Sequence, residues 1–248
     1  MLYIKPKNMK QLIIAIVLIA SLSGLLLLSS CDSARGNGKV VTDLRQPQAF
    51  TRLNVNGTFP VVLSQDTGGP WVKVVTDENL QDLVELTSNG DELTISMVEK
   101  SSIKSKEFKV YVNVDKLTEI NYKSVGGLST KGILKLDSLQ LTSESVGKLN
   151  IGINADFLRA NLDNVGSTTL RGQVREARIN TKSVGSLRAF DLKTQDILLH
   201  NTAVGSAEIY ADSTFHIRSS AVGSVKYKGP GQVLELSNEG VGKVKHID

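Results

Sequence analysis

The chain has 248 residues, of which 40% are apolar and 22% are charged, and its formal net charge is +4. This apolar content is enough to bury a core, which excludes an intrinsically disordered protein. Lys5, Lys7 and Lys10 lie in an N-terminal segment that has no acidic residue, so the remainder of the chain is nearly neutral. Because binding to a phosphate backbone requires a basic excess, we expect no nucleic-acid partner.

Residues 1–30 have the pattern of a lipoprotein signal peptide. A basic start ends at Lys10, and an apolar run follows from Leu12 to Leu28 with small residues inside it. This run is short for a membrane span and typical of a signal peptide. It ends in Leu28-Ser29-Ser30-Cys31, which resembles the lipobox of bacterial lipoproteins.

Cys31 is the only cysteine of the chain, so it cannot form an internal disulfide in an exported protein. An uncleaved N-terminal anchor and a free external thiol are the alternatives. We favour lipidation of Cys31, because it explains the apolar run, the small residues and the lone cysteine together. We therefore expect a cell-envelope lipoprotein anchored in the outer membrane and facing the periplasm or the surface.

Residues 31–48 are predicted to form the lipidated cysteine and a flexible tether, because they are rich in Ser, Gly, Asn and Arg. Within them, Gly36-Asn37-Gly38-Lys39 lacks the strand and helix that a phosphate loop requires. Residues 49–115 contain short segments of alternating apolar and polar residues, which predict strands. These segments lie at residues 50–55, 59–63, 71–76, 83–86, 93–97 and 108–114, and residues 77–82 are predicted to form one helical turn.

Residues 116–248 contain a Val-Gly dipeptide seven times, at intervals of 21, 19, 19, 20, 18 and 19 residues. A glycine at a corner can take a positive φ or allow successive coils to approach closely. We therefore assign a structural corner role to Gly126, Gly147, Gly166, Gly185, Gly205, Gly223 and Gly242.

The repeats also align in apolar columns that alternate with polar ones. Seven and five residues before each valine, and three and five residues after it, the side chains are mostly apolar. Alternation within a unit of about 19 residues predicts one coil of a parallel β-helix, a β-solenoid with stacked inward columns. A leucine-rich repeat would need a different motif, and a propeller needs about 40 residues for each blade. The fold class is therefore all-β.

The chain resembles the family described as putative auto-transporter adhesin, head GIN domain. The resemblance rests on residues 50–57 (Phe-Thr-Arg-Leu-Asn-Val-Asn-Gly), 61–65 (Val-Val-Leu-Ser-Gln) and 91–95 (Asp-Glu-Leu-Thr-Ile), and on the Ser-Val-Gly units. It implies a single-stranded, right-handed parallel β-helix whose N-terminal strands occupy residues 49–115 and whose repeats occupy 116–248. It also implies a role in adhesion, and it brings no catalytic residues.

The residues themselves indicate no catalytic site, metal site or cofactor. The Asp residues of the repeats occupy differing positions and are interpreted as turn formers. His200 and His216 fall on neighbouring coils of one outward face, without a third ligand at a fixed spacing. Aromatic residues make up only 5% of the chain, so a carbohydrate-binding aromatic face is not predicted.

We therefore predict a lipid-anchored, non-catalytic adhesin or binding scaffold with a glycan or protein ligand. The serine-rich face at the stacked Val-Gly corners is the candidate binding surface, and solvated corners are its plain alternative. The strand edge of the last coil, with Lys243 and Lys245, is a candidate contact for a homo-oligomer. A polysaccharide-active enzyme is the alternative, and it would need acidic residues of the segment 65–105 to converge: Asp66, Asp77, Glu78, Asp82, Glu85, Asp91 and Glu92. A third hypothesis is that the ligand is another protein of the same cell envelope.

Overall fold

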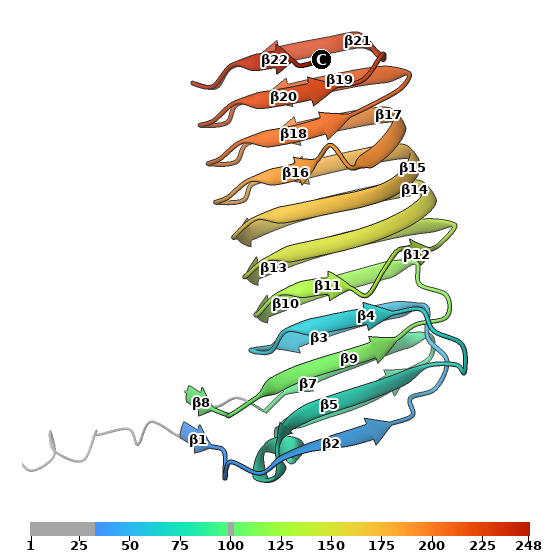
Figure 1. The fold of residues 1–248 in the computed structure, drawn as a ribbon, viewed down its shortest axis with the longest axis vertical. Coiled ribbons are helices and arrows are strands. Elements are labelled where there is room, and N and C mark those ends of the chain that lie inside the picture. The colour runs from blue at the N-terminus through green and yellow to red at the C-terminus, as the bar shows by residue number, and fades with distance from the viewer. Residues whose placement is uncertain (1–32, 99–101) are drawn as a thin grey trace, which may run out of the picture. The chain divides into compact units, whose positions relative to one another are not determined.

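A computed structural model describes residues 33–98 and 102–248 of the chain. The predicted signal peptide and Cys31 lie outside the described residues. A two-stranded sheet is formed by β1 (Ser33–Arg35) and β8 (Ser102–Lys104), and the other described strands belong to a second unit. This second unit is a β-solenoid (Figure 1).

The solenoid has two long faces of parallel strands, and each turn of the chain is called a rung here. On the first face the strands that stack are β3 (Arg52–Gly57), β10 (Glu119–Val125), β13 (Ser138–Val146), β14 (Leu149–Val165), β15 (Thr168–Thr181), β17 (Leu192–Asn201), β19 (Thr214–Ser219) and β21 (Gln232–Asn238). The second face contains β4 (Val61–Ser64), β11 (Leu128–Thr130), the first halves of β14 and β15, β16 (Leu187–Ala189), β18 (Ala207–Tyr210), β20 (Val225–Lys228) and β22 (Val244–His246). The parallel β-helix predicted from the repeats is thus confirmed.

The first corner, at the Val-Gly dipeptides, leads from the first face to the second. It lies at the left edge of the solenoid in Figure 1, where β10 passes into β11. The second corner returns the chain to the first face and lies on the opposite edge, where β12 (Leu134–Lys135) and the bends of β14 and β15 are found.

The core is built by the predicted inward columns. Residues five before each valine pair in register from rung to rung, as Leu141 does with Ile120 and with Ala160. Alternation directs every second side chain inward, so these columns form one continuous apolar interior. The buried members of this column are Ile120, Leu141, Ala160, Ile179, Leu199 and Ile217.

Two predicted inward residues point outward instead. Thr118 is exposed, and its backbone N–H and hydroxyl both donate to the carbonyl oxygen of Thr51, while the neighbouring Leu117 is buried. Leu234 is also exposed, because a bulge shifts the register between β19 and β21 and pairs Phe215 with Val233. A bulge adds one residue to one strand, which reverses the direction of the side chain at that position.

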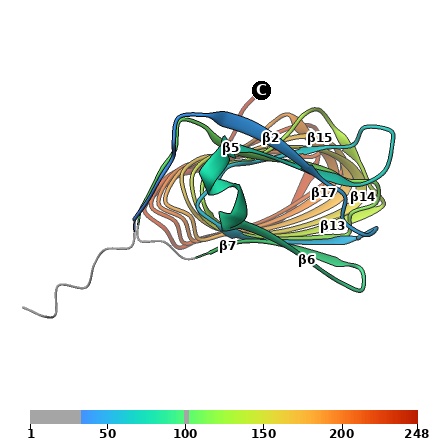
Figure 2. The same ribbon diagram turned by 90° about the horizontal axis from the view of Figure 1, so that it is seen from below.

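The N-terminal end of the stack is closed by the segment between β4 and β10. Here β7 (Glu92–Met97) and β9 (Phe108–Asn113) continue the parallel faces. Then β5 (Trp71–Asp77) and β6 (Val84–Asn89) add antiparallel strands. The 3-10 helix η2 (Glu78–Leu83) lies over the N-terminal end of the stack in Figure 2, and its own residue Leu80 is buried. The single helical turn predicted for residues 77–82 is present in this helix.

Part of the segment interpreted as a tether belongs to the solenoid. β2 (Val40–Arg45) pairs antiparallel with β5 along its whole length, and Gly38 N–H donates to Asp77 Oδ1. The composition of this segment alone favours a loop, but its backbone groups are satisfied by an antiparallel partner that lies 27 to 37 residues further along the chain. Likewise, β3 and β4 are already a rung of the stack, so the solenoid begins before residue 116.

The C-terminal end has no such covering segment among the described residues. In the part of the chain that the structure describes, β21 pairs only with β19, and β22 only with β20. Leu236 stands in register with the buried Ile217 but is 49% exposed. Lys243 and Lys245 are exposed beside this last rung, where charged side chains disfavour pairing between edges.

Candidate functional site

The seven predicted corner glycines form a ladder at the first corner. Five of them have φ between 136° and 154°, where residues with a side chain are strained. A Cβ atom on any of these five would also collide with the carbonyl oxygen of the corner glycine one rung before. These five are Gly147, Gly166, Gly185, Gly205 and Gly223. Gly126 is crowded by the Phe59–Pro60 backbone and Gly242 by Gly223, so all seven positions require a residue without a side chain.

The valines of the same corner point to solvent and form a continuous apolar ridge. Six are 52–58% exposed and the last is 86% exposed, and each of the first six pairs with its neighbour in parallel register. With rungs about 4.8 Å apart, seven valines extend over about 29 Å. The valine ridge consists of Val125, Val146, Val165, Val184, Val204, Val222 and Val241.

The expected serine column lies on one flank of the valine ridge. Ser167, Ser186, Ser206 and Ser224 are partly buried there, and Ser206 Oγ lies 3.2 Å from Ser186 Oγ. The corner predicted as a serine-rich face therefore also carries an exposed apolar ridge. The missed signal is the alternation itself, since the residue before each of the first six valines is buried and the valine must then face outward.

A buried polar network supports the corner from inside. The Asn164 side-chain oxygen accepts hydrogen bonds from Ser143 Oγ (2.8 Å), Ser145 Oγ (2.8 Å) and the Ser145 backbone N–H (3.0 Å). The backbone N–H of Asn164 donates to Ser183 Oγ on the next rung. These bonds join three rungs directly behind the valine ridge and hold the corner in register.

The second corner carries a polar groove that is open to solvent. Its largest hollow has a volume of about 440 Å³, and a second hollow of about 360 Å³ shares three of its residues. Two outward columns line it. The first consists of Lys135, Asn154, Gln173 and Lys193, and the second of Asp137, Asp156, Arg175 and Gln195, with Asp212 beyond Lys193. We call this set the second-corner groove.

The second-corner groove is polar but has no excess of either charge. Three cationic side chains (Lys135, Arg175 and Lys193) stand among three carboxylates (Asp137, Asp156 and Asp212). Three amide side chains add both donors and acceptors. Because a cleft of one sign concentrates ligands of the opposite sign, a balanced cleft favours a neutral, hydroxyl-rich ligand.

An aromatic ring stands beside the groove. Tyr210 Oη donates to Asp212 Oδ1 at 2.7 Å, and Lys193 Nζ lies 3.6 Å from the centre of the Tyr210 ring. The Asp212 carboxylate raises the pKa of Tyr210 above 10.0, because it accepts the hydrogen bond of the neutral phenol. The tyrosine is thereby tied to two residues that line the groove.

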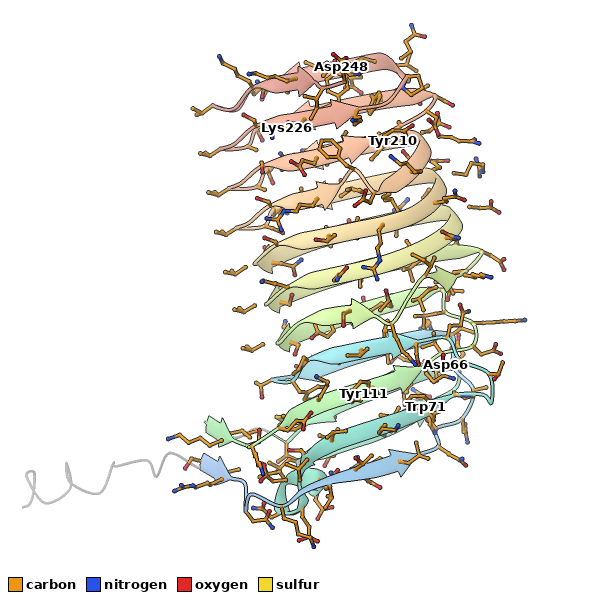
Figure 3. The ribbon with its side chains drawn as sticks, viewed as in Figure 1. Asp66, Trp71, Tyr111, Tyr210, Lys226 and Asp248 are labelled. Carbon is orange, nitrogen blue, oxygen red and sulfur yellow. The ribbon has the colours of Figure 1, made fainter. Side chains whose placement is uncertain are left out.

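The other aromatic residues do not gather at one site. Tyr122 is buried, with a pKa raised to about 12 by that burial, and Tyr227 packs on Phe215. Trp71 and Tyr111 lie on the second face near its N-terminal end, apart from Tyr210 (Figure 3). Lys73 Nζ lies 5.2 Å from the Trp71 ring centre, and Lys109 occupies a similar place over Tyr111.

The acidic residues of the segment 65–105 do not converge. Asp66 lies near Lys131, Glu78 pairs with Lys39, and Asp91 and Glu92 both contact Arg52. Asp77 is buried and accepts hydrogen bonds from the backbone N–H groups of Gly38 and Lys106. Asp82 and Glu85 are exposed. The cluster that a polysaccharide-active enzyme would need from this segment is therefore not formed.

The shifted carboxyl groups also do not suit a general acid. Hydrogen bonds from Lys39, Arg52 and Arg218 lower the pKa values of Glu78, Asp91 and Glu235 respectively. A general acid needs a raised pKa instead.

The predicted proximity of the two histidines is found, because Leu198 pairs with His216 and His200 with Arg218. His216 Nδ1 lies 3.6 Å from Glu235. Over residues 33–98 and 102–248, no three His, Cys, Asp or Glu side chains are grouped to hold a metal ion. In the same residues, no helix is long and apolar enough to cross a membrane.

The family model described as putative auto-transporter adhesin, head GIN domain, matches residues 49–231. No curated protein matches the chain. A putative adhesin from Bacteroides fragilis superposes with a TM-score of 0.81 at 23% identity, covering 86% of this chain and 99% of its own. A putative lipid binding protein from Parabacteroides distasonis (18% identity, TM-score 0.64) and a putative adhesin from Parabacteroides merdae (22%, 0.59) have the same coverage. At these identities the three structures support the fold.

Proposed function

Because the chain belongs to the family described as putative auto-transporter adhesin, head GIN domain, we propose that it is a lipid-anchored, non-catalytic adhesin that binds an extended, neutral glycan in the second-corner groove. The family indicates a protein of the surface or envelope. The observation that supports a neutral glycan as the ligand is the groove itself, which contains the amide side chains of Asn154, Gln173 and Gln195 and equal numbers of cationic and anionic side chains.

The repeat of the groove suits a polymer better than a small molecule. Asn154, Gln173 and Lys193 recur at the rung spacing of about 4.8 Å in one column. A linear glycan offers hydroxyl groups at a regular spacing, and each amide can both donate to and accept from such groups.

The shallow, open form of the groove favours binding without turnover. Hydrolysis of a glycosidic bond requires two carboxyl groups on opposite sides of the bond, one of them with a raised pKa. In the groove Asp137 and Asp156 belong to one column on adjacent rungs, so they lie on the same side of any bound chain. Asp212 is hydrogen-bonded to Tyr210.

The anchor part of the proposal rests on the Leu28-Ser29-Ser30-Cys31 pattern. A lipid on Cys31 would hold the adhesin at the membrane. Cys31→Ala should abolish incorporation of a labelled fatty acid while leaving the far-ultraviolet circular dichroism of the chain unchanged. Labelled protein recovered from that variant would contradict the anchor.

The ligand part is tested with the full chain, purified in detergent, on an array of neutral and charged glycans. We expect saturable binding to neutral glycans, and at least tenfold weaker binding for Gln173→Ala and for Gln195→Ala. Gln140→Ala is the matched control, because Gln140 is an exposed glutamine on the first face. Equal loss in the control, or binding restricted to polyanions, would overturn the assignment of the groove. Release of shorter products from a bound glycan would show an enzyme instead.

A further inference from the structure

The valine ridge leaves seven aliphatic side chains in solvent along one straight line. Scattered surface valines are ordinary, but a contiguous apolar array on a soluble face indicates a contact surface. Identical side chains stacked in parallel register can interdigitate with a second such array, as they do in a steric zipper. A second copy of this chain presents an array of the same length and spacing.

A shallow groove lies beside the first three valines of the valine ridge. It has a volume of about 370 Å³, and Val125, Val146 and Val165 form one wall of it. Lys123, Glu144 and Asp163, each two residues before a valine, are also part of its lining. In a two-fold dimer each ridge would lie in the groove of the other copy, which is the self-complementary contact that this symmetry requires.

The charges on the two flanks of the ridge select the direction of pairing. The sequence Glu-x-Val-Gly-Lys occurs twice, at residues 144–148 and 239–243, and all four charged side chains are exposed. Within the chain, Glu144 Oε2 lies 3.1 Å from Lys123 Nζ in an exposed ion pair, which a partner's lysine can join or replace. The glutamate stands on the first-face flank of the ridge and the lysine on the second-face flank. A two-fold axis parallel to the ridge brings the first-face flank of one copy against the second-face flank of the other at the same rung.

We propose that the chain forms a parallel, in-register homodimer along the valine ridge, with ion pairs from Glu144 to the partner's Lys148 and from Glu239 to the partner's Lys243. At the five other rungs, the residue two before the valine of one copy is charged or carries a hydroxyl group, and it lies opposite a serine or glycine of the other copy. No like charges therefore meet at these rungs. An antiparallel dimer centred on Val184 would pair Lys123 with the partner's Glu239, but it would also place Lys182 of one copy opposite Lys182 of the other and would lose the pairs of Glu144 and Lys148. Like charges at an interface are costly, so the parallel direction is preferred.

This dimer does not use the edge of the last rung, which the sequence pattern indicated as a candidate contact for a homo-oligomer. It also leaves the second-corner groove free, because the two corners lie on opposite edges of the solenoid (Figure 1).

Disulfide cross-linking in the membranes of cells that express the full chain tests the proposal. Val125→Cys and Val241→Cys, each expressed alone, should both give disulfide-linked dimers on a non-reducing gel. Cross-linking only when the two variants are expressed together would show an antiparallel pair and overturn the proposal. Absence of dimers from both would overturn it as well. The unchanged chain, which retains Cys31, and Ser129→Cys on the second face are the controls and should show at least tenfold less dimer.

Reversal of single charges shows whether the ion pairs, and not apolar association alone, determine the amount of dimer. Glu239→Lys in the Val241→Cys background should reduce the dimer band at least fivefold, because two lysines then face each other. Adding Lys243→Glu to the same chain should restore it, because the pair is re-formed with reversed sign. A dimer band that ignores both changes, or that the second change does not restore, would contradict the proposed register.

Discussion

Substitution of Gly185 by alanine tests most directly whether the first corner requires glycine at each rung. Gly185 has φ of 145°, and a Cβ atom there would collide with the backbone of Gly166. A side chain in this region of φ costs about 1–3 kcal/mol. Forcing a methyl group against a well-packed backbone costs about 1–3 kcal/mol more. The expected loss in the free energy of unfolding is therefore about 2–6 kcal/mol, a large share of the total of about 5–15 kcal/mol for a domain.

Gly132→Ala separates the two contributions. Gly132 also has a positive φ, of 130°, but a Cβ atom there meets nothing within 4 Å. Its expected loss is the backbone contribution alone, about 1–3 kcal/mol. Both variants are compared with the unchanged chain by urea unfolding followed by circular dichroism. Equal losses for Gly185→Ala and Gly132→Ala would refute the reasoning that close approach of the rungs requires glycine at the corner.

Three further perturbations test the core, the inner network and the ion pairs. Ile179→Asp should unfold the stack, because an unpaired buried carboxylate costs several kcal/mol, whereas Asn180→Asp on the outer surface should leave the melting temperature within a few degrees; two similar melting curves would contradict the assigned register. Asn164→Ala should lower the free energy of unfolding by about 1–3 kcal/mol, because it leaves a buried backbone N–H without an acceptor, and a loss below the error of urea titration would exclude that role. The lowered pKa of Glu235 means that its contact with Arg218 stabilises the fold above pH 4.5 and is lost as the pH falls through the lower folded value. Glu235→Gln should therefore flatten the acid side of the stability–pH curve, and an unchanged curve would remove Glu235 from the account.

The inward columns were predictable because alternation and the 19-residue repeat reinforce each other. Ile179, for example, falls five residues before a valine, as do its buried neighbours in the rungs on either side. A shift of the register by one residue would expose the whole column at once. The exceptions, Thr118 and Leu234, both occur where the strict repeat begins or ends.

The closing of the N-terminal end could not be read from the sequence. β2 pairs with β5, and Arg45 donates to the carbonyl oxygen of Gln81 in η2 at 3.0 Å. These partners lie about 30 or more residues apart in the chain, and no local sequence pattern predicts that they pair. The polar composition before residue 49 predicted a flexible tether. Ordering this segment costs conformational entropy, and only contacts with residues distant in the sequence offset that cost.

The second-corner groove was missed for a different reason. The variation in repeat length falls at this corner, so its residues do not keep a fixed distance from the valines. Asp137 lies twelve residues after Val125, whereas Arg175 lies ten after Val165. The register of the backbone aligns them through Asp156. In the sequence the aspartates therefore seemed scattered, and they were interpreted as turn formers.

A calorimetric titration of the chain with neutral glycans of increasing length tests glycan binding in the second-corner groove most directly. The four rungs from Asp137 to Gln195 extend over about 14 Å. We expect that affinity rises with each added sugar until the glycan spans these rungs and then levels off. Gln173→Ala should lower this plateau at least tenfold, and the glycan should be recovered intact. Affinity that is already maximal for a single sugar, or a glycan that is recovered shortened, would contradict the proposed function.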